Sequence, residues 1–274
     1  MAKKHLFWLS AGVSLSLLIG GFFSRAYAEA PGGAEEIMRR SSLVQFYSGN
    51  DMKAKVRMRL LSKDGGERVR ELIMARRNVK AGGNQKYFIL FLQPADVRDM
   101  TFLVWKYPLK DSDRWLYIPA IKLVKRIAAN DKRSSFVGSD FSYEDVSGRA
   151  VEEDNHTLLR EEKFEGKDVF VVKSVPKDEK SADFGYKVSW IDKGNFVLWK
   201  EEYYDKRGAL FKVFTADEVK PIQGFPTTVK RTMKNVQTGH WTEAAYGEVK
   251  YNLGLADGVF TERSLRNPPR ELAR

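Results

Sequence analysis

Residues 52–60 leave the chain few ways to fold. In their sequence, MKAKVRMRL, every second residue is apolar and the residues between them are lysine or arginine. Successive side chains of a β-strand point to opposite faces, so this stretch is predicted to be a strand with one buried and one cationic face. Asp64-Gly65-Gly66 then forms a turn, and residues 67–76 return as the second strand of a hairpin. The rest of the chain must cover the apolar face of this hairpin.

Further strand-like segments follow at hairpin distances. They are rich in β-branched and aromatic residues, and turn-like connectors with Gly, Asn or Asp separate several of them. They are residues 86–92, 101–107, 114–119, 122–127, 157–164, 168–175, 186–191, 196–204, 210–219, 226–235 and 240–252. The pattern predicts a large antiparallel meander of roughly eleven strands.

Three short segments predict helices. Residues 34–47 place apolar side chains on one helical face and two glutamates in the first turn, where the helix dipole favours acids. Residues 142–145 have the spacing of a capping box, and residues 261–266 form a third candidate. A large antiparallel sheet with few helices can bury a face by curling around them. We therefore predict a mainly β, α+β fold, in which a curved antiparallel sheet forms an incomplete barrel plugged by short helices.

The first 28 residues predict a secretory signal peptide. A short basic start precedes an apolar run at residues 6–23, and Ala26-Tyr27-Ala28 supplies a small-x-small cleavage site. An uncleaved membrane anchor is the alternative, but it needs about 20 strongly apolar residues, and serines and glycines interrupt this run. We predict cleavage after Ala28. Residues 29–274 are then expected to form a single domain, because no Pro- or Ser-rich linker divides them.

Composition narrows the classes of partner. The chain contains no cysteine, which excludes disulfides, thiolate metal sites and thiol catalysis. The formal net charge is +11, and removal of residues 1–28, with three basic residues and no acid, leaves +8. Export makes nucleic acid an unexpected partner, so an anionic membrane or cell-envelope surface fits the charge better. Simple solubility is the alternative explanation.

Residues 114–119 depart from the alternation of a half-covered strand. Trp115 and Tyr117 point to one side and Leu116 and Ile118 to the other, so both faces need apolar cover. Either this strand is the wall of an apolar cavity that is also covered outside, or it lies between two ordinary core layers.

Several segments resemble, in order, those of the outer-membrane lipoprotein-sorting, LolA-like family of periplasmic proteins. The most specific is RWLYIPAIKLVKRI followed by SSFVGSDFSYEDV, within residues 113–146. FLQPADVRDMTFLVW, YYDKRGALFKV, TGHWTEAAYGEVKYN and FTERSL are also similar to segments of that family. The chain departs from the family at Arg98-Asp99-Met100-Thr101, where members often have a glycine before the threonine. The resemblance spans nearly the whole mature chain.

The resemblance implies an incomplete barrel closed by helices around an apolar cavity. It also implies a periplasmic carrier of lipid, or of the acyl chains of lipoproteins, that works with an inner-membrane transporter of the resistance-nodulation-division type. The candidate wall residues are grouped by parity within each strand, and the parity that faces the cavity is left open. They are Phe88, Leu90, Phe102, Val104, Trp115, Tyr117, Trp190 and Phe196.

The stretch after residue 127 suggests a cover for this cavity. Three aromatic side chains would lie over an opening, an acid would pair with an arginine of the preceding strands as a latch, and a glycine would provide a sharp turn or a hinge. The residues of this predicted latch are Arg114, Arg126, Phe136, Gly138, Asp140, Phe141, Tyr143 and Asp145. The alternative is a fixed corner whose aromatic residues fill the core and whose charges satisfy loop backbone.

We find no catalytic constellation in the sequence. His156 and His240 lie far apart, and neither has metal-ligand spacing. VGSDFS lacks the Gly-x-Ser-x-Gly pattern of a nucleophile elbow. We therefore predict a protein that is not an enzyme and that uses no metal or cofactor. A sensor or accessory subunit of an envelope transporter complex is the alternative to a carrier, because fold does not fix function.

Overall fold

The computed structural model of the protein describes residues 32–80 and 82–273, so the predicted signal peptide lies outside the described residues. Thirteen strands form one antiparallel sheet, which confirms the predicted meander. The strand count exceeds the roughly eleven expected, because the first hairpin adds two strands to the later segments. The strands are β1 (Asp51–Leu61), β2 (Glu67–Asn78), β3 (Gln85–Gln93), β4 (Thr101–Lys106), β5 (Asp113–Ile118), β6 (Leu123–Arg126), β7 (Asp154–Phe164), β8 (Lys167–Pro176), β9 (Tyr186–Asp192), β10 (Leu198–Tyr204), β11 (Leu210–Ile222), β12 (Phe225–Asn235) and β13 (His240–Tyr251).

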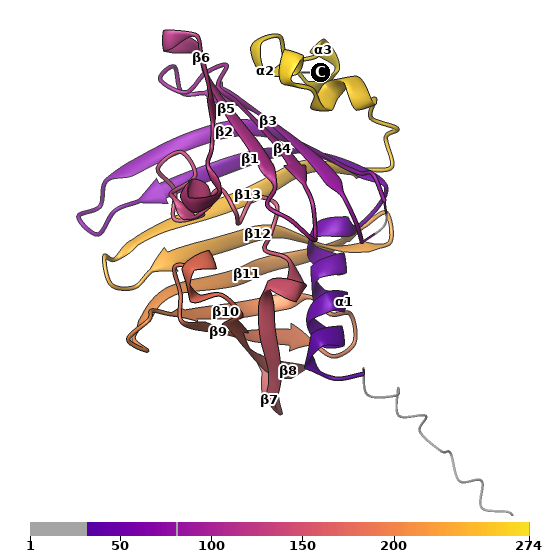
Figure 1. Cartoon of the computed structure of the whole chain (residues 1–274), viewed down its shortest axis with the longest axis vertical. Coiled ribbons are helices and arrows are strands. Elements are labelled where there is room, and N and C mark those ends of the chain that lie inside the picture. Colours follow the sequence, from indigo (N-terminus) through magenta and orange to yellow (C-terminus); the bar gives the residue numbers. More distant parts are fainter. Residues whose placement is uncertain (1–31, 81, 274) are drawn as a thin grey trace, which may run out of the picture. The chain divides into compact units, whose positions relative to one another are not determined.

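The strand order shows how the chain builds this sheet. From β1 the sheet grows strand by strand to β6 at one edge, and the chain then crosses to β7 at the other edge. It returns strand by strand to β13, which pairs with β1 (Figure 1). Within the described residues β6 and β7 do not pair, so the sheet is an incomplete barrel, as predicted. We call residues 127–153, which connect β6 to β7, the crossing segment.

The alternation predicted for residues 52–60 is confirmed in β1. Ala54, Val56, Met58 and Leu60 are buried, whereas the basic residues between them are half-buried or exposed. The buried side chains belong to the largest apolar cluster of the protein, which also contains aromatic residues of the crossing segment. We call this face of the sheet the inner face and the opposite one the outer face.

Helix α1 (Ala34–Tyr47) confirms the helix predicted for the same residues. Ile37 and Met38 pack with Phe170, Val172 and Ile191, so α1 covers the inner face near β8 and β9 (Figure 1). Short 3-10 helices lie in the connections. They are η1 (Pro119–Ile121), η2 (Ala129–Arg133), η3 (Val151–Glu153), η4 (Glu179–Ser181) and η5 (Asp257–Phe260).

The C-terminal segment covers the outer face of β2–β5. It consists of η5, α2 (Glu262–Arg266), which confirms the third predicted helix, and α3 (Arg270–Ala273). Phe260, Leu265 and Leu272 are fully buried there. The indole N–H of Trp105 donates to the carbonyl of Phe260 at 2.9 Å, and the hydroxyl of Thr101 donates to that of Leu265 at 2.8 Å. These bonds fix the segment to β4.

The two apolar faces of β5 are explained by this arrangement. Leu116 and Ile118 pack into the inner apolar cluster. Trp115 and Tyr117 pack outward under the C-terminal segment. The inner apolar cluster and the C-terminal segment are both needed, because each covers one of the two apolar faces of this strand.

The helix predicted at residues 142–145 is a single turn instead. The two hydrogen bonds of a capping box are present, since Ser142 N–H donates to Asp145 Oδ2 at 2.7 Å and Asp145 N–H donates to Ser142 Oγ at 3.1 Å. Gly148 follows with φ at 77°, in the left-handed region, and its N–H bonds to the carbonyl of Glu144. A left-handed glycine ends a helix, so the chain stops after one turn.

Candidate functional site

The predicted wall residues do not share one face, so their grouping as a single cavity wall is wrong. Phe102 and Val104 lie on the inner face. Phe196 packs beside α1, which covers the inner face near β8 and β9. The other five lie on the outer face or away from the inner cluster: Phe88, Leu90, Trp115 and Tyr117 pack under the C-terminal segment, and Trp190 packs with Val169 and Val171. Parity within a strand defines two faces, but it does not say which residues of neighbouring strands are matched, because that depends on register.

The apolar inner wall includes residues that were not proposed from the sequence. Val56, Leu72, Met74 and Ile89 line a hollow of about 30 Å³ beside β1–β3, together with Phe136 and Phe141 of the crossing segment. The alternation in residues 52–60 was the available indication, since Val56 belongs to its apolar set. The β1–β2 and β2–β3 registers then align Val56 with Leu72 and Met74 with Ile89.

Two further hollows adjoin this one. The larger, of about 90 Å³, lies between α1, the crossing segment and strands β9–β12. The other, of about 70 Å³, lies between the end of α1, β1–β3 and β12–β13. All three are lined from the inner face, so this face is the candidate ligand site of the protein.

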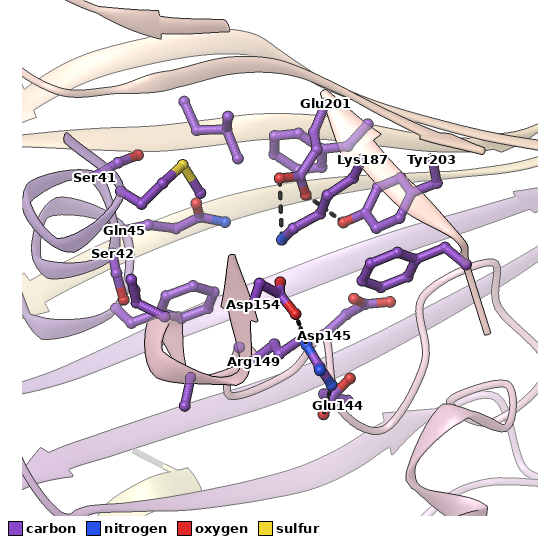
Figure 2. A pocket seen from close by; sticks show the side chains of 18 of the residues that line it. Ser41, Ser42, Gln45, Glu144, Asp145, Arg149, Asp154, Lys187, Glu201 and Tyr203 are labelled. Carbon is purple, nitrogen blue, oxygen red and sulfur yellow. Dashed lines mark hydrogen bonds and ion pairs between the residues drawn. The ribbon is translucent and has the colours of Figure 1, made fainter. Parts of the chain in front are cut away.

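A buried ion pair crosses the larger hollow. Lys187 Nζ lies 3.2 Å from Glu201 Oε1, and Glu201 also accepts a hydrogen bond from Tyr203 (Figure 2). Ser189 donates a second hydrogen bond to Glu201. Burial lowers the pKa of Lys187, but the charges of Glu201 and Asp154 and the hydrogen bond to Glu201 together hold that pKa above its usual value. Burial and then Glu201 raise the pKa of the Tyr203 phenol. Lysine is therefore charged and tyrosine neutral at physiological pH.

A second set of charges ties the crossing segment to β7. Arg149 Nε lies 2.9 Å from Asp154 Oδ1 of β7 (Figure 2). Within the crossing segment itself, Arg149 Nη1 lies 2.9 Å from Glu153 Oε2. Lys132 Nζ lies 2.8 Å from Glu144 Oε1 on the same segment. These pairs are largely buried, and each cation has at least one carboxylate.

Two inner-face cations have a different environment. Lys106 is buried, donates to the carbonyl of Ser147 at 2.6 Å and lies over the rings of Phe46 and Tyr47. Burial lowers the pKa of Lys106 to about 7. Burial also lowers the pKa of Arg231, to about 10.

The arginines of the predicted latch have other partners, so the predicted pairing is wrong. Arg126 pairs with Asp113, because the register of β5 and β6 brings both to the same end of the hairpin. Arg114 is buried and donates to the carbonyl of Ser112 at 3.2 Å. Neither arginine therefore pairs with an acid of the predicted latch, and Arg114 Nε is buried without a hydrogen bond.

The acids of the predicted latch are also held elsewhere. Asp140 accepts from the Thr242 hydroxyl at 2.7 Å and lies 2.8 Å from His240 Nδ1, both on β13. Its own N–H donates to Thr242 Oγ1 at 3.0 Å. Asp145 accepts from the Ser142 backbone. The crossing segment is thus fastened to β13 through Asp140.

The aromatic residues of the crossing segment fill the inner face. The ring of Phe136 lies 5.4 Å from that of Phe102 and 5.8 Å from that of Phe91, and Tyr143 lies 5.3 Å from Phe102. Phe136, Phe141 and Tyr143 are all buried. Gly138 has φ at 80°, which provides the predicted sharp turn. Its role as a hinge stays a prediction.

His156 is also held within the fold. Its Nδ1 lies 2.8 Å from Ser174 Oγ and its Nε2 lies 2.8 Å from the carbonyl of Val151. Burial lowers the pKa of His156. In residues 32–80 and 82–273 no group of three or more His, Asp or Glu side chains is placed to hold a metal ion. In the same part of the chain, no helix is long and apolar enough to cross a membrane.

Comparisons with known proteins agree with this architecture. A protein-family model with the description "Uncharacterized protein" matches residues 83–267. A domain from Vibrio parahaemolyticus described as an outer membrane lipoprotein-sorting protein is 32% identical, with a TM-score of 0.79, over 85% of this chain and 98% of that one. A DUF1329 family protein from Desulfovibrio piger is 28% identical, with a TM-score of 0.79, over 85% of this chain and 97% of that one.

A LolA superfamily protein from Nitrosomonas europaea shares the fold at 21% identity. Its TM-score is 0.65, over 84% of this chain and 98% of that one. A search of curated proteins found no match. The fold and the inner face thus define a LolA-like half-barrel, and the chain belongs to the outer-membrane lipoprotein-sorting family.

Proposed function

We propose that the protein is a periplasmic carrier of lipid, or of lipoprotein acyl chains, in outer-membrane lipoprotein sorting or lipid transport. The observation that carries this proposal is the inner face of the incomplete barrel, which is apolar on β1–β5 and is covered by the aromatic crossing segment. Burial of an acyl chain there would be favourable by about 25 cal/mol per Å² of apolar surface. Membership of the lipoprotein-sorting family supports the same function.

The hollows in this conformation are small for such a cargo. They measure about 90, 70 and 30 Å³, whereas ligand pockets usually span roughly 300–1,000 Å³. Phe136, Phe141 and Tyr143 fill the space that an acyl chain would need. The carrier proposal therefore requires the crossing segment to move away from β13 when cargo binds.

An engineered disulfide tests this requirement. Asp140 and Thr242 are bonded side chain to side chain, and the chain has no other cysteine, so Asp140→Cys/Thr242→Cys forms one defined crosslink. With the disulfide oxidised, saturable binding of a fluorescent fatty acid should fall at least tenfold, and reduction should restore it. Asp140→Ser/Thr242→Ser is the matched control. Equal binding in the oxidised and reduced forms would contradict opening at this segment.

Periplasmic location rests on the predicted signal peptide, with cleavage after Ala28. N-terminal sequencing of the protein from a periplasmic extract should begin at Glu29. An intact Met1 in the membrane fraction would overturn this part of the proposal.

A membrane partner is part of the proposal. Ile121 and Leu123 are 65% and 45% exposed at the β5–β6 edge, beside Lys122 and Lys125. Exposed apolar and basic side chains together favour an anionic bilayer. Flotation with vesicles containing phosphatidylglycerol, but not with pure phosphatidylcholine, is expected. Native mass spectrometry should find lipid in gently purified protein; a stoichiometric complex with an inner-membrane transporter and no lipid would favour the sensor alternative.

A further inference from the structure

Arg231, on the inner face of β12, has no polar partner among the described residues. Its Nε is buried without a hydrogen bond, and no ion pair or hydrogen bond joins its guanidinium to another side chain of that part of the protein. The guanidinium lies instead over two rings, 4.4 Å from the centroid of Tyr246 and 5.8 Å from that of Phe141. Leaving a donor such as this Nε–H unpaired in the interior costs free energy. The same holds for Arg70 and Arg114, which also have a buried guanidinium nitrogen without a hydrogen bond, but Arg231 is the one that lines the three inner hollows.

The neighbours of Arg231 leave room around it. In the sheet register Arg231 stands opposite Ala216 of β11 on one side and Ala244 of β13 on the other. Both alanines are buried on the inner face. Two short side chains beside a long one create a gap, and Arg231 lines all three inner hollows, which no other lining residue does.

The charges nearby do not neutralise Arg231. In the larger hollow Glu201 is paired with Lys187, and Asp154 is paired with Arg149. Asp145 lines two of the hollows with Arg231, and its negative charge opposes the lowering of the pKa of Arg231 by burial. The two side chains nevertheless form no ion pair, and Asp145 accepts a hydrogen bond from the Ser142 N–H of its own segment. Arg231 is thus an inner-face cation whose counter-charge can be supplied by cargo.

The smallest hollow beside Arg231 is apolar. Apart from Arg231, its only charged lining residue is Asp145. The apolar side chains nearest to a cargo chain there belong to Val56, Met58, Leu72, Met74 and Ile89. A cation in the lining of an apolar hollow matches a molecule with an anionic head and a hydrocarbon chain.

We propose that Arg231 anchors the anionic head of an amphiphilic cargo, a carboxylate or a phosphate, while the chain of the cargo replaces the aromatic side chains of the crossing segment against β1–β3. A guanidinium can bind either head with two parallel N–H···O bonds. This inference rests on the proposed carrier function and adds the chemical class of the cargo. Neutral amphiphiles of the same chain length should bind more weakly.

The experiment compares three variants of the mature chain with the wild type. Arg231→Gln removes the charge, whereas Arg231→Lys keeps the charge but lacks the paired N–H donors of a guanidinium. Lys230→Gln is the matched control, because it removes an exposed charge at the preceding position. Each is titrated with oleate, oleyl phosphate and oleyl alcohol, which share one chain, and with inorganic phosphate. Displacement of a fluorescent fatty acid gives the affinities of the three amphiphiles, and calorimetry gives that of inorganic phosphate.

We expect the wild type and Lys230→Gln to bind both anionic amphiphiles at least tenfold more tightly than the alcohol. Arg231→Gln should lose this preference, because its affinity for the anionic amphiphiles should fall tenfold or more while its affinity for the alcohol stays unchanged. The preference of Arg231→Lys for anionic amphiphiles should lie between that of the wild type and that of Arg231→Gln. The ranking of oleate and oleyl phosphate identifies the preferred head. The melting temperature of Arg231→Gln should not fall, because the variant removes a partly buried charge that forms no ion pair. If it does fall, the same titrations are made with Arg231→Met, which keeps an unbranched side chain.

Three results would overturn the anchor. Unchanged selectivity in a folded Arg231→Gln variant would show that Arg231 does not hold the head, while the carrier function would stand. Inorganic phosphate binding as tightly as oleyl phosphate, and lost in Arg231→Gln, would make this a small-anion site. Absence of saturable binding for all three amphiphiles would instead reject the carrier function itself.

Discussion

The two ends of the inner face are built on opposite principles. At the aromatic end, on β3 and β4, Phe91 and Phe102 meet Phe136 and Tyr143 of the crossing segment without a polar group between the rings. At the charged end, on β9 and β10, Lys187 and Glu201 form a buried pair. The aromatic end is held by packing, which a ligand chain can replace. At the charged end, separating a buried charge from its partner is costly. This end is therefore expected to stay in place while the aromatic end opens.

The largest expected effect is at the aromatic end. Phe102 is fully buried, and Phe102→Ala should lower the free energy of unfolding by about 4 kcal/mol, as for other buried Phe→Ala changes. Urea denaturation measures it. Phe164→Ala, at a half-buried position, is the control and should cost less. A loss below about 1.5 kcal/mol for Phe102→Ala would mean that the aromatic end is loosely packed.

At the charged end, replacing one member of the Lys187–Glu201 pair should lower the stability more than replacing both. Glu201→Ala leaves Lys187 without its counter-ion and Tyr203 and Ser189 without their acceptor, and it should cost about 3 kcal/mol. Lys187→Met/Glu201→Met should recover most of this loss, because two apolar side chains need no partner. A double-mutant cycle by urea denaturation measures the coupling. Additive losses would show that the pair is not a unit.

The last effect is a dependence on pH, which is gradual, and it concerns Lys106, a cation within the aromatic half. Its pKa is about 7 in the folded protein and about 10.5 when exposed, so between these values the unfolded chain holds more protons. The free energy of unfolding should therefore rise with pH across that window, by at most ~1.4 kcal/mol per pH unit. Below pH 7 this pH dependence should vanish, because Lys106 is then protonated in both states and its destabilising effect is complete. Lys106→Met should flatten this rise in urea titrations from pH 7 to 9.5. Lys110→Met, at an exposed position, should leave it unchanged; a rise that survives in Lys106→Met would assign it to another group.

The pattern of apolar and polar residues predicts secondary structure well where a single segment forms the element. The alternation of residues 52–60 predicted β1, and the apolar spacing of residues 34–47 predicted α1. Residues 142–145 show the limit of such evidence. The capping-box bonds form there, but Gly148 ends the turn before a helix can continue.

Matching of distant segments was predicted less well. The proposed wall mixed the two faces, because Phe88 of β3 and Phe102 of β4 have the same parity in the sequence but lie on opposite faces in the sheet. The latch failed for a related reason, since Asp140 bonds to Thr242 and His240, about a hundred residues away. A single sequence carries no direct record of such partners.

The strands, two of the three helices, the two-sided burial of residues 114–119 and the family resemblance could be predicted, because each depends on the order of side chains along one stretch of chain. Which residues share the inner face, and which charges are paired, depends on how distant strands meet in the folded protein. Strand register and the pairing of β13 with β1 place Arg231 between Ala216 and Ala244. The nearby carboxylates of Glu201 and Asp154 are already paired with Lys187 and Arg149. An unpaired cation is defined by what surrounds it in space, and the order of residues along the chain does not specify those surroundings.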